Sequence, residues 1–183
     1  MTGRRRTPSD EPMKTLILMR HAKSSWATPG MADHDRPLNE RGRRAAPVMA
    51  RWLAARGLIP ETILCSSSER TRQTVRRMRK AVPELPEPVI EPGLYESGPD
   101  EMQASLARLP AGSGTAMIVA HEPGTGEMLS RLTGREHGPF PTAAIAVLEL
   151  EIGSWADRPW YRGRLRELVR PRDLMEMSEN PVG

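Results

Sequence analysis

"LILMRHAKSSW", residues 16–26, joins a short apolar run directly to two basic side chains, Arg20 and His21. A continuous apolar run such as residues 14–19 is typical of a strand that is covered on both faces of a sheet. Lys23 follows almost at once, and three basic or titratable groups so close together repel one another unless an anion lies among them. The stretch therefore predicts a buried strand that ends beside a negative group, and by itself it leaves open whether that group is a structural carboxylate, a nucleic acid or a substrate phosphate.

The remaining elements alternate between strand and helix, which predicts the α/β class. Apolar runs predict further strands, at 61–65, 88–91, 114–121, 143–152 and, as an edge strand, 163–170. Helices are predicted between them, at about 40–56, 69–82, 100–109 and 122–134. Asn39, Asp100 and one of the serines at 66–68 are suited to cap three of these helices. Pro47 lies inside the first of them and is expected to bend or loosen it.

Composition limits the domain organisation and the partners. A chain of 183 residues is most simply one domain, which we place at residues 13–175 between a flexible tail at 1–12 and a C-terminal tail at 176–183. The net charge of +4 favours an anionic partner. Arginines are spread over every segment, so neither they nor the basic N-terminal tail indicates a nucleic-acid interface.

The cysteine content and the hydropathy pattern indicate where the protein works. Cys65 is the only cysteine, so an internal disulfide is excluded and a reducing compartment, the cytoplasm, is expected. No apolar run approaches the ~18 residues of a membrane span, and no apolar segment follows the basic start as in a signal peptide. We therefore expect no membrane association.

Four charged residues follow three of the predicted strands. Arg20 and His21 follow the first strand, Arg70 lies in the first turn of the helix after the second, and His121 closes the third. Ligands of open α/β sheets bind beyond the carboxyl ends of the strands, where helix N-termini also attract anions. These four side chains are thus predicted to form one oxyanion pocket.

At these residues the chain resembles the histidine phosphatase superfamily. LILMRHAKSSW resembles the RHG-type signature of that family, with Ala22 in place of the usual glycine, and three later blocks follow in the same order: DRPLNERGRRAA, SSSERTRQT and MIVAHEPGTGEML. The short length, Ala22 and the stretch FPTAAIAVLEL resemble the SixA-type phosphohistidine phosphatase branch. The resemblance spans about residues 14–170 and implies a three-layer α/β/α fold with a mostly parallel, phosphoglycerate mutase-like sheet.

The resemblance also implies a reaction. His21 would be the nucleophile that carries the phosphoryl group, while Arg20 and Arg70 bind the phosphoryl oxygens and His121 donates a further hydrogen bond. Water would then release inorganic phosphate. We expect no metal and no cofactor, because the two arginines neutralise the charge that Mg²⁺ handles in other phosphatases.

Several other residues receive weaker assignments. Ser24 matches a family position near the phosphate, although a loop-stabilising role is equally compatible with the sequence. Lys23 is interpreted as a solvated charge at the rim of the pocket. His34 and His137 match no motif and are expected to be exposed loop residues.

Two departures from related branches bear on the substrate. Ala27 stands where the phosphoglycerate mutase branch has a substrate-contacting asparagine, and the insertion that carries a general acid elsewhere is reduced to EPGLYESGPDEM. Glu96 is a candidate general acid there, although a structural ion pair is the simpler interpretation. A weak acid suits a phosphohistidine substrate, because imidazole leaves more readily than an alkoxide.

The preferred function is therefore hydrolysis of protein phosphohistidine, and three alternatives were weighed against it. A small phosphorylated molecule as the substrate of the same scaffold remains the serious alternative. A cysteine phosphatase is excluded because its C-x₅-R motif would need arginine at position 71, where Thr71 stands. A phosphate-binding module without activity is disfavoured because it would have no need of His21.

Overall fold

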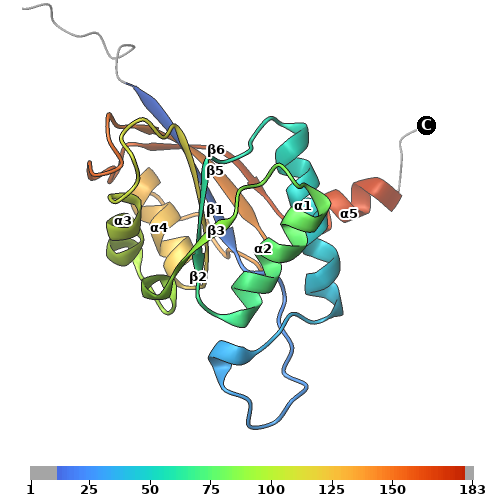
Figure 1. Cartoon of the computed structure of the whole chain (residues 1–183). Coiled ribbons are helices and arrows are strands. Elements are labelled where there is room, and N and C mark those ends of the chain that lie inside the picture. Colours follow the sequence, from blue (N-terminus) through green and yellow to red (C-terminus); the bar gives the residue numbers. More distant parts are fainter. Residues whose placement is uncertain (1–11, 180–183) are drawn as a thin grey trace, which may run out of the picture.

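A six-stranded sheet forms the centre of the computed structural model, which describes residues 12–179 (Figure 1). The strands are β1 (Met13–Arg20), β2 (Thr62–Ser66), β3 (Pro88–Glu91), β4 (Thr115–Ala120), β5 (Ile145–Glu151) and β6 (Gly163–Val169). The helices are α1 (Glu40–Ala55), α2 (Glu69–Ala81), α3 (Pro99–Leu106), α4 (Gly124–Thr133) and α5 (Pro171–Glu179), with two short 3₁₀ turns, η1 (Asp33–Asp35) and η2 (Pro92–Leu94).

The strand order β3-β2-β4-β1-β5-β6 confirms the predicted, mostly parallel α/β sheet. Strands β1 to β4 pair with one another in parallel, whereas β5 runs antiparallel to β1, and β6 antiparallel to β5. The carboxyl ends of β1, β2 and β4 therefore lie at one edge of the sheet. Because Ile145 at the start of β5 pairs with Val169 at the end of β6, these two ends lie at the same edge.

Both faces of the sheet are covered by helices, as the apolar run of β1 predicts. Ile17 and Met19 point into the layer with α1 and α2, while Leu16 and Leu18 point into the layer with α3 and α4, and all four are fully buried. Figure 1 shows these two layers on opposite sides of the sheet. Each such buried side chain stabilises the fold by roughly 1.5–3 kcal/mol, so β1 is anchored from both faces.

The starts of α1 and α2 and the end of α4 have the capping residues that the sequence predicts, whereas the start of α3 does not. The side chains of Asn39 and Ser68 accept hydrogen bonds from the first turns of α1 and α2, and Gly134 ends α4 with a left-handed φ of 73°. Helix α3 begins at Pro99 rather than after Asp100, because Gly98 takes the cap position. It also ends at Leu106, three residues before the predicted end.

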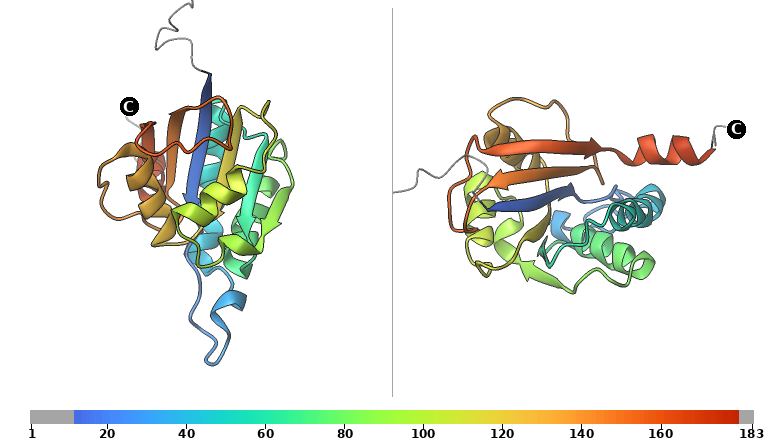
Figure 2. Two further views of the ribbon diagram at one scale, coloured as in Figure 1. Left: turned by 90° about the vertical axis from the view of Figure 1, so that its left-hand side faces the viewer. Right: turned by 90° about the horizontal axis from the view of Figure 1, so that it is seen from above.

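The C-terminal helix α5 corrects the predicted domain boundary. It continues to Glu179, so residues 176–179 are helical rather than part of a tail. The proline at its first position and the acidic residue in its first turn are sequence signals for a helix start that the sequence analysis overlooked. Figure 2 shows α5 extending beyond the end of β6. The predicted N-terminal tail lies, except for Pro12, outside the described residues.

Helix α1 is continuous through Pro47, although a proline removes one backbone hydrogen bond from a helix interior. Its buried side chains pack against the sheet and α2, and this packing outweighs the lost bond. Within residues 12–179, no helix combines the length and the apolar character that a membrane crossing requires.

Candidate active site

The backbone at the end of β1 is fixed to both neighbouring strands. The His21 amide donates a hydrogen bond to the carbonyl of Ala120 at 3.0 Å. On the other side, the Ala143 amide donates to the carbonyls of both Arg20, at 3.1 Å, and His21, at 3.0 Å. His21 is therefore held between β4 and the segment that leads into β5.

The loop after His21 is also fixed by α1 and α2. The Asn39 amide donates to the Lys23 carbonyl at 2.9 Å, and the Ala22 amide donates to the Thr74 hydroxyl at 3.0 Å. A Cβ atom at Gly42 would collide with the backbone of Lys23, so the start of α1 can approach the loop only with glycine there. Both helices thus hold the orientation of His21.

The structure brings the four predicted residues together. Nε of Arg70 lies 3.3 Å from Nε2 of His21, and Nη2 of Arg70 lies 3.3 Å from Nδ1 of His121. The centroids of the two imidazole rings are 5.2 Å apart. Arg20 is close enough for its charge to lower the pKa of both histidines, and the charge of Arg70 in turn lowers the pKa of Arg20. Side chains from the ends of β1 and β4 and from the start of α2 thus share one small volume.

The hydrogen bonds fix which ring nitrogen of each histidine carries the proton. Nδ1 of His21 lies 2.7 Å from the carbonyl of Ala22, which only accepts, so Nδ1 carries the proton and Nε2 presents a lone pair to Arg70. In His121, Nδ1 accepts from Arg70, whereas Nε2 donates to the Ser66 hydroxyl at 2.7 Å. In both rings the nitrogen that faces the shared volume is unprotonated.

Both imidazoles are neutral near pH 7. Burial lowers the pKa of His21 to about 3, and the adjacent His121, Arg70 and Arg20 act in the same direction. Burial and the nearby Arg70 lower the pKa of His121 to about 4. A neutral imidazole with a free lone pair is a competent nucleophile toward phosphorus.

These shifted pKa values predict a loss of stability in mild acid. Between about pH 6.5 and pH 4 the unfolded chain protonates His21 and His121 while the native protein keeps them neutral, so the free energy of unfolding falls by roughly 1.4 kcal/mol per pH unit for each histidine. Urea denaturation at several pH values measures this slope. His21→Asn is expected to remove the contribution of His21 from the pH dependence of the free energy of unfolding, roughly 1.4 kcal/mol per pH unit. An unchanged pH dependence would contradict the buried, neutral state of His21.

Arg70 is held in place by Asp33, a residue that the sequence analysis did not identify. Nη1 of Arg70 donates to the Asp33 carbonyl at 2.6 Å, and Nη2 donates to its carboxylate at 3.0 Å. The same carboxylate accepts from the Tyr95 hydroxyl at 2.7 Å and from Arg36 at 2.7 Å. Partial burial by itself raises the pKa of Asp33, but these three donors hold that pKa well below its usual range. Asp33 thus aims the Nε edge of Arg70 at the histidines.

Arg20 carries a buried donor that has no partner among the described residues. Its Nη1 donates to the Phe140 carbonyl at 3.1 Å, whereas its Nε is buried and forms no hydrogen bond within residues 12–179. Burial lowers the pKa of Arg20, and the carboxylate of Glu122 opposes that effect. A buried N–H without a partner is costly, so this donor fits an oxyanion bound beside it.

A cavity of about 540 Å³ opens beside Arg70 and His121 and is rich in carboxylates. It is lined by Asp33, Arg70, Tyr95, Glu96, Ser97, Gly98, His121, Glu122, Pro123 and Glu127. The predicted candidate acid Glu96 lies in this wall, is exposed and has a positive φ of 55°. Glu122, which the sequence analysis overlooked although it directly follows His121, is half-buried, and burial raises its pKa.

The weaker candidates lie around this site rather than inside it. The Ser24 hydroxyl accepts a hydrogen bond from Arg36 and so helps to hold the loop between β1 and α1. His34 was expected to be exposed but is partly buried, because its ring bonds the Ser67 hydroxyl at 2.9 Å and packs edge-on against Tyr95. His137 is also partly buried and bonds Thr133 at 2.6 Å.

Cys65 has the properties of a packed core residue. It is fully buried, and burial raises the pKa of its thiol to about 12. A thiol with so high a pKa is a poor nucleophile at neutral pH, which agrees with the exclusion of cysteine phosphatase chemistry from the motif spacing.

Comparisons with known proteins bear on the family of this chain. Residues 16–135 match the model of the histidine phosphatase superfamily (branch 1). The Mycobacterium tuberculosis protein Rv1276c is 35% identical over 149 residues, which cover 76% of this chain and 90% of that protein. The chloroplastic Arabidopsis thaliana protein At3g52155 is 31% identical over 178 residues, which cover 90% of this chain and 81% of that protein.

Solved structures show the same fold. A protein from Nakamurella multipartitia, assigned as a phosphohistidine phosphatase SixA, superposes with a TM-score of 0.74 at 29% identity, and the match covers 87% of this chain and 96% of that chain. An Agrobacterium tumefaciens protein with the same assignment gives a TM-score of 0.73 at 29% identity, with 86% and 99% covered. The family model and these relatives agree on one conclusion: the chain belongs to the histidine phosphatase superfamily.

Proposed function

We propose that this protein hydrolyses protein phosphohistidine through a phosphoryl group carried on His21. Membership of the superfamily supports phosphatase activity in general, and the proposal adds the residue roles and the substrate class. The observation that carries it is the unprotonated Nε2 of His21, which faces the guanidinium of Arg70 beside His121. A nucleophile with positive charge around it suits attack on a phosphoryl group.

The proposed reaction has two steps. In the first, the substrate phosphohistidine is already protonated on its second ring nitrogen; Nε2 of His21 attacks phosphorus, the P–N bond of the substrate breaks with its electron pair staying on the ring, and the substrate leaves as neutral imidazole. In the second, water attacks phosphorus, the bond to His21 breaks, and inorganic phosphate is released. Arg20 and Arg70 bind the phosphoryl oxygens throughout, and a bound dianion favours a proton on Nδ1 of His121, which then donates a hydrogen bond.

The carboxylate-lined cavity supports a leaving group that is neutral or positively charged. Phosphohistidine that is protonated on its ring carries a positive charge there, so Glu96, Glu122 and Glu127 would attract this ring and would repel an anionic leaving group. The two SixA-assigned relatives favour the same substrate class. A small phosphate monoester is the alternative, since a related fold also occurs in an Escherichia coli protein assigned as an α-ribazole-5'-phosphate phosphatase, at 18% identity and a TM-score of 0.65.

A direct comparison of substrates tests the proposal. The specificity constant kcat/KM is measured for a phosphohistidine-bearing phosphotransfer domain and for a panel of phosphate monoesters under the same conditions. The proposal expects the phosphohistidine protein to be the better substrate by at least about 100-fold, a difference of ~2.7 kcal/mol in the barrier. A monoester that reaches the same kcat/KM would make this protein a small-molecule phosphatase.

The leaving group is expected to control the rate. Phosphoramidate should be turned over well, aryl phosphates more slowly and alkyl phosphates barely, because none of the carboxylates in the cavity is required for imidazole to depart. Glu96→Gln and Glu122→Gln are each expected to change phosphohistidine turnover by less than about tenfold, whereas loss of a true general acid costs ~10²–10⁴. A rate independent of leaving-group pKa, with a large defect in either variant on alkyl esters, would identify that carboxylate as the acid.

Activity is expected to persist in EDTA and after thiol alkylation. Arg20 and Arg70 supply the positive charge at the phosphoryl oxygens, and Cys65 is buried within the core. Turnover of phosphoramidate is measured before and after dialysis against EDTA, and after treatment with iodoacetamide. A loss that a divalent ion restores would show that the two arginines do not suffice.

A further inference from the structure

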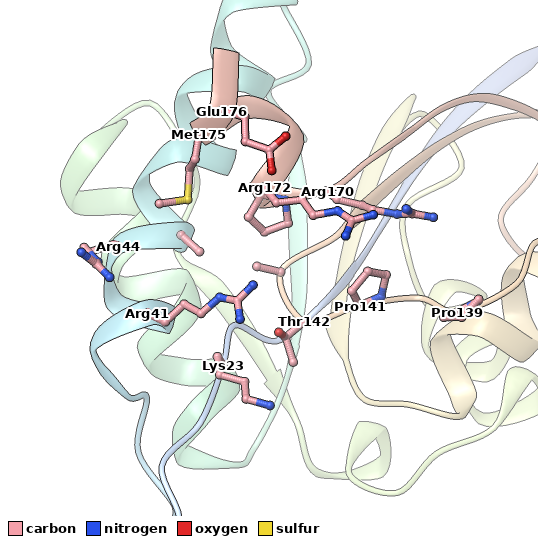
Figure 3. A pocket seen from close by; sticks show the side chains of 13 residues that line it. Lys23, Arg41, Arg44, Pro139, Pro141, Thr142, Arg170, Arg172, Met175 and Glu176 are labelled. Carbon is pink, nitrogen blue, oxygen red and sulfur yellow. The ribbon is translucent and has the colours of Figure 1, made fainter. Parts of the chain in front are cut away.

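A second cavity, of about 520 Å³, has residues from the segment before β5 and from the end of β6 in its lining, and Figure 3 shows the side chains that surround it. It is lined by Lys23, Arg41, Arg44, Ala45, Pro139, Pro141, Thr142, Ala143, Arg170, Pro171, Arg172, Met175 and Glu176. Its walls come from the loop after β1, the start of α1, the segment before β5 and the junction of β6 with α5. We call it the basic cleft.

The topology of the sheet separates the basic cleft from the catalytic pocket. β4 and β2 lie on one side of β1. His121 directly follows β4, and Arg70 lies at the start of α2, the helix that follows β2. β5 and β6 lie on the other side of β1 and border the cleft. The segment 139–143 forms the shared wall, since the Phe140 carbonyl binds Arg20 while Pro139, Pro141 and Thr142 line the cleft. The two cavities are therefore neighbours with no lining residue in common.

The charge of the basic cleft is strongly one-sided. Five cationic side chains line it against one carboxylate, that of Glu176. Arg172 has only a distant ion pair, 3.8 Å from Asp173. Within the described residues, no hydrogen bond or ion pair is formed by the other four side chains, which are Lys23, Arg41, Arg44 and Arg170. Positive side chains that line a concave surface raise the local concentration of anions.

Some arginines elsewhere on the surface have a carboxylate partner, whereas others, such as Arg51, form no ion pair within the described residues. Arg43, Arg108 and Arg131, for example, each pair with a carboxylate at 2.6–2.9 Å. The chain has 23 acidic residues, so carboxylates are not scarce. The cleft is therefore distinguished by its five cationic side chains around one concavity, and not by the absence of partners alone.

The walls between the cations are apolar. Pro139, Pro141 and Pro171 line the cleft together with Met175 and two alanines. Figure 3 shows Arg41 extending from α1 toward Thr142, with Arg172 above it and Lys23 below. A ligand that fits these walls carries several anionic groups on a body with apolar surface. The volume falls in the range of ~300–1,000 Å³ that is typical of small-molecule sites.

We propose that the basic cleft is a second, non-catalytic binding site for a small organic polyanion of about nucleotide size. Guanidinium forks bind phosphate or carboxylate oxygens in pairs, and the proline walls contact the body of the ligand. The cleft lies across β1 from the carboxylate-lined cavity, so its occupant is a molecule separate from the leaving group. The proposal does not depend on the substrate class given above.

Calorimetric titration with ATP, used as a probe polyanion, tests the proposal. The catalytic pocket is first saturated with tungstate, a tetrahedral oxyanion, and ATP is then expected to bind with a stoichiometry of one, while adenosine does not bind. Arg41→Gln and Arg172→Gln are each expected to raise the dissociation constant of ATP about tenfold or more, since each removes a charge-assisted contact. Arg51→Gln, an exposed position on the same helix outside the cleft, is the matched control and leaves the constant unchanged.

Three results would overturn the proposal. Loss of ATP binding in the presence of tungstate would place ATP in the catalytic pocket. If Arg51→Gln weakened ATP binding as much as Arg41→Gln does, the binding would depend on the net charge of the protein and not on the cleft. An absence of ATP binding, together with slower turnover of a phosphohistidine protein by Arg41→Gln, would make the cleft a protein-docking surface. His21→Ala is expected to retain ATP binding, so a failure of the catalytic assignment is distinguished from a failure of the cleft.

Discussion

Replacing His21 with alanine is expected to lower kcat/KM by at least about 10⁴-fold and to abolish the acid-labile phosphoenzyme. The loss corresponds to ~5.5 kcal/mol of barrier and follows from removal of the only group that forms a bond to phosphorus in the proposed first step. The Nε2 atom that alanine removes lies 3.3 Å from Nε of Arg70. Rapid quenching with a ³²P-labelled substrate detects the intermediate, and steady-state turnover of phosphoramidate gives kcat/KM.

The control for this variant is His137→Ala, which removes a partly buried imidazole from a loop outside the site. Circular dichroism and urea denaturation establish that both variants are folded. His137→Ala is expected to keep wild-type turnover. Activity of His21→Ala within about tenfold of the wild type would disprove the role of His21.

Replacing Arg70 with lysine is expected to lower kcat/KM by about 10³-fold although the positive charge is kept. Arg70 contacts His21 through Nε and His121 through Nη2, while Asp33 holds its two terminal nitrogens. A lysine ammonium is a single point charge and cannot keep Asp33 and the phosphoryl oxygens bound together. Arginines that bind a phosphoryl group in its transition state contribute ~10³–10⁵ to the rate.

Two measurements separate this effect from a general loss of charge or fold. Arg77→Lys, at an exposed position on α2, is the matched control and is expected to keep wild-type kcat/KM. Tungstate binding by calorimetry is expected to weaken in Arg70→Lys and to remain unchanged in Arg77→Lys. A lysine variant within tenfold of the wild type would show that charge alone suffices at this position.

The four residues of the pocket could be located from the sequence because each follows a strand that the sequence marks clearly. Apolar runs such as residues 14–19 and 114–121 end abruptly at a basic residue, and parallel strands bring their carboxyl ends to one edge. Local signals therefore sufficed for Arg20, His21 and His121. Arg70 required one further step, the assignment of the helix that begins next to it.

The residues that orient the pocket could not be located in the same way. Asp33 reaches Arg70 from a 3₁₀ turn inside the 19-residue connection between β1 and α1, residues 21–39, and the Tyr95 hydroxyl reaches Asp33 from 62 positions further along the chain. No periodicity or motif encodes contacts between two irregular loops, because their conformations depend on the packing of the whole domain. The basic cleft was hidden for the same reason, since its arginines come from α1 and from the β6–α5 junction.

The hydrogen bond from Nδ1 of His21 to the Ala22 carbonyl also determines the chemical identity of the proposed intermediate. With Nδ1 committed to the backbone, only Nε2 is free to accept the phosphoryl group, so the enzyme would carry the 3-phosphohistidine isomer and never the 1-phosphohistidine isomer. A free histidine side chain allows both isomers. One main-chain oxygen, the Ala22 carbonyl, thus determines which isomer forms on His21. The isomer on the enzyme is the same whether the substrate is 1-phosphohistidine or 3-phosphohistidine.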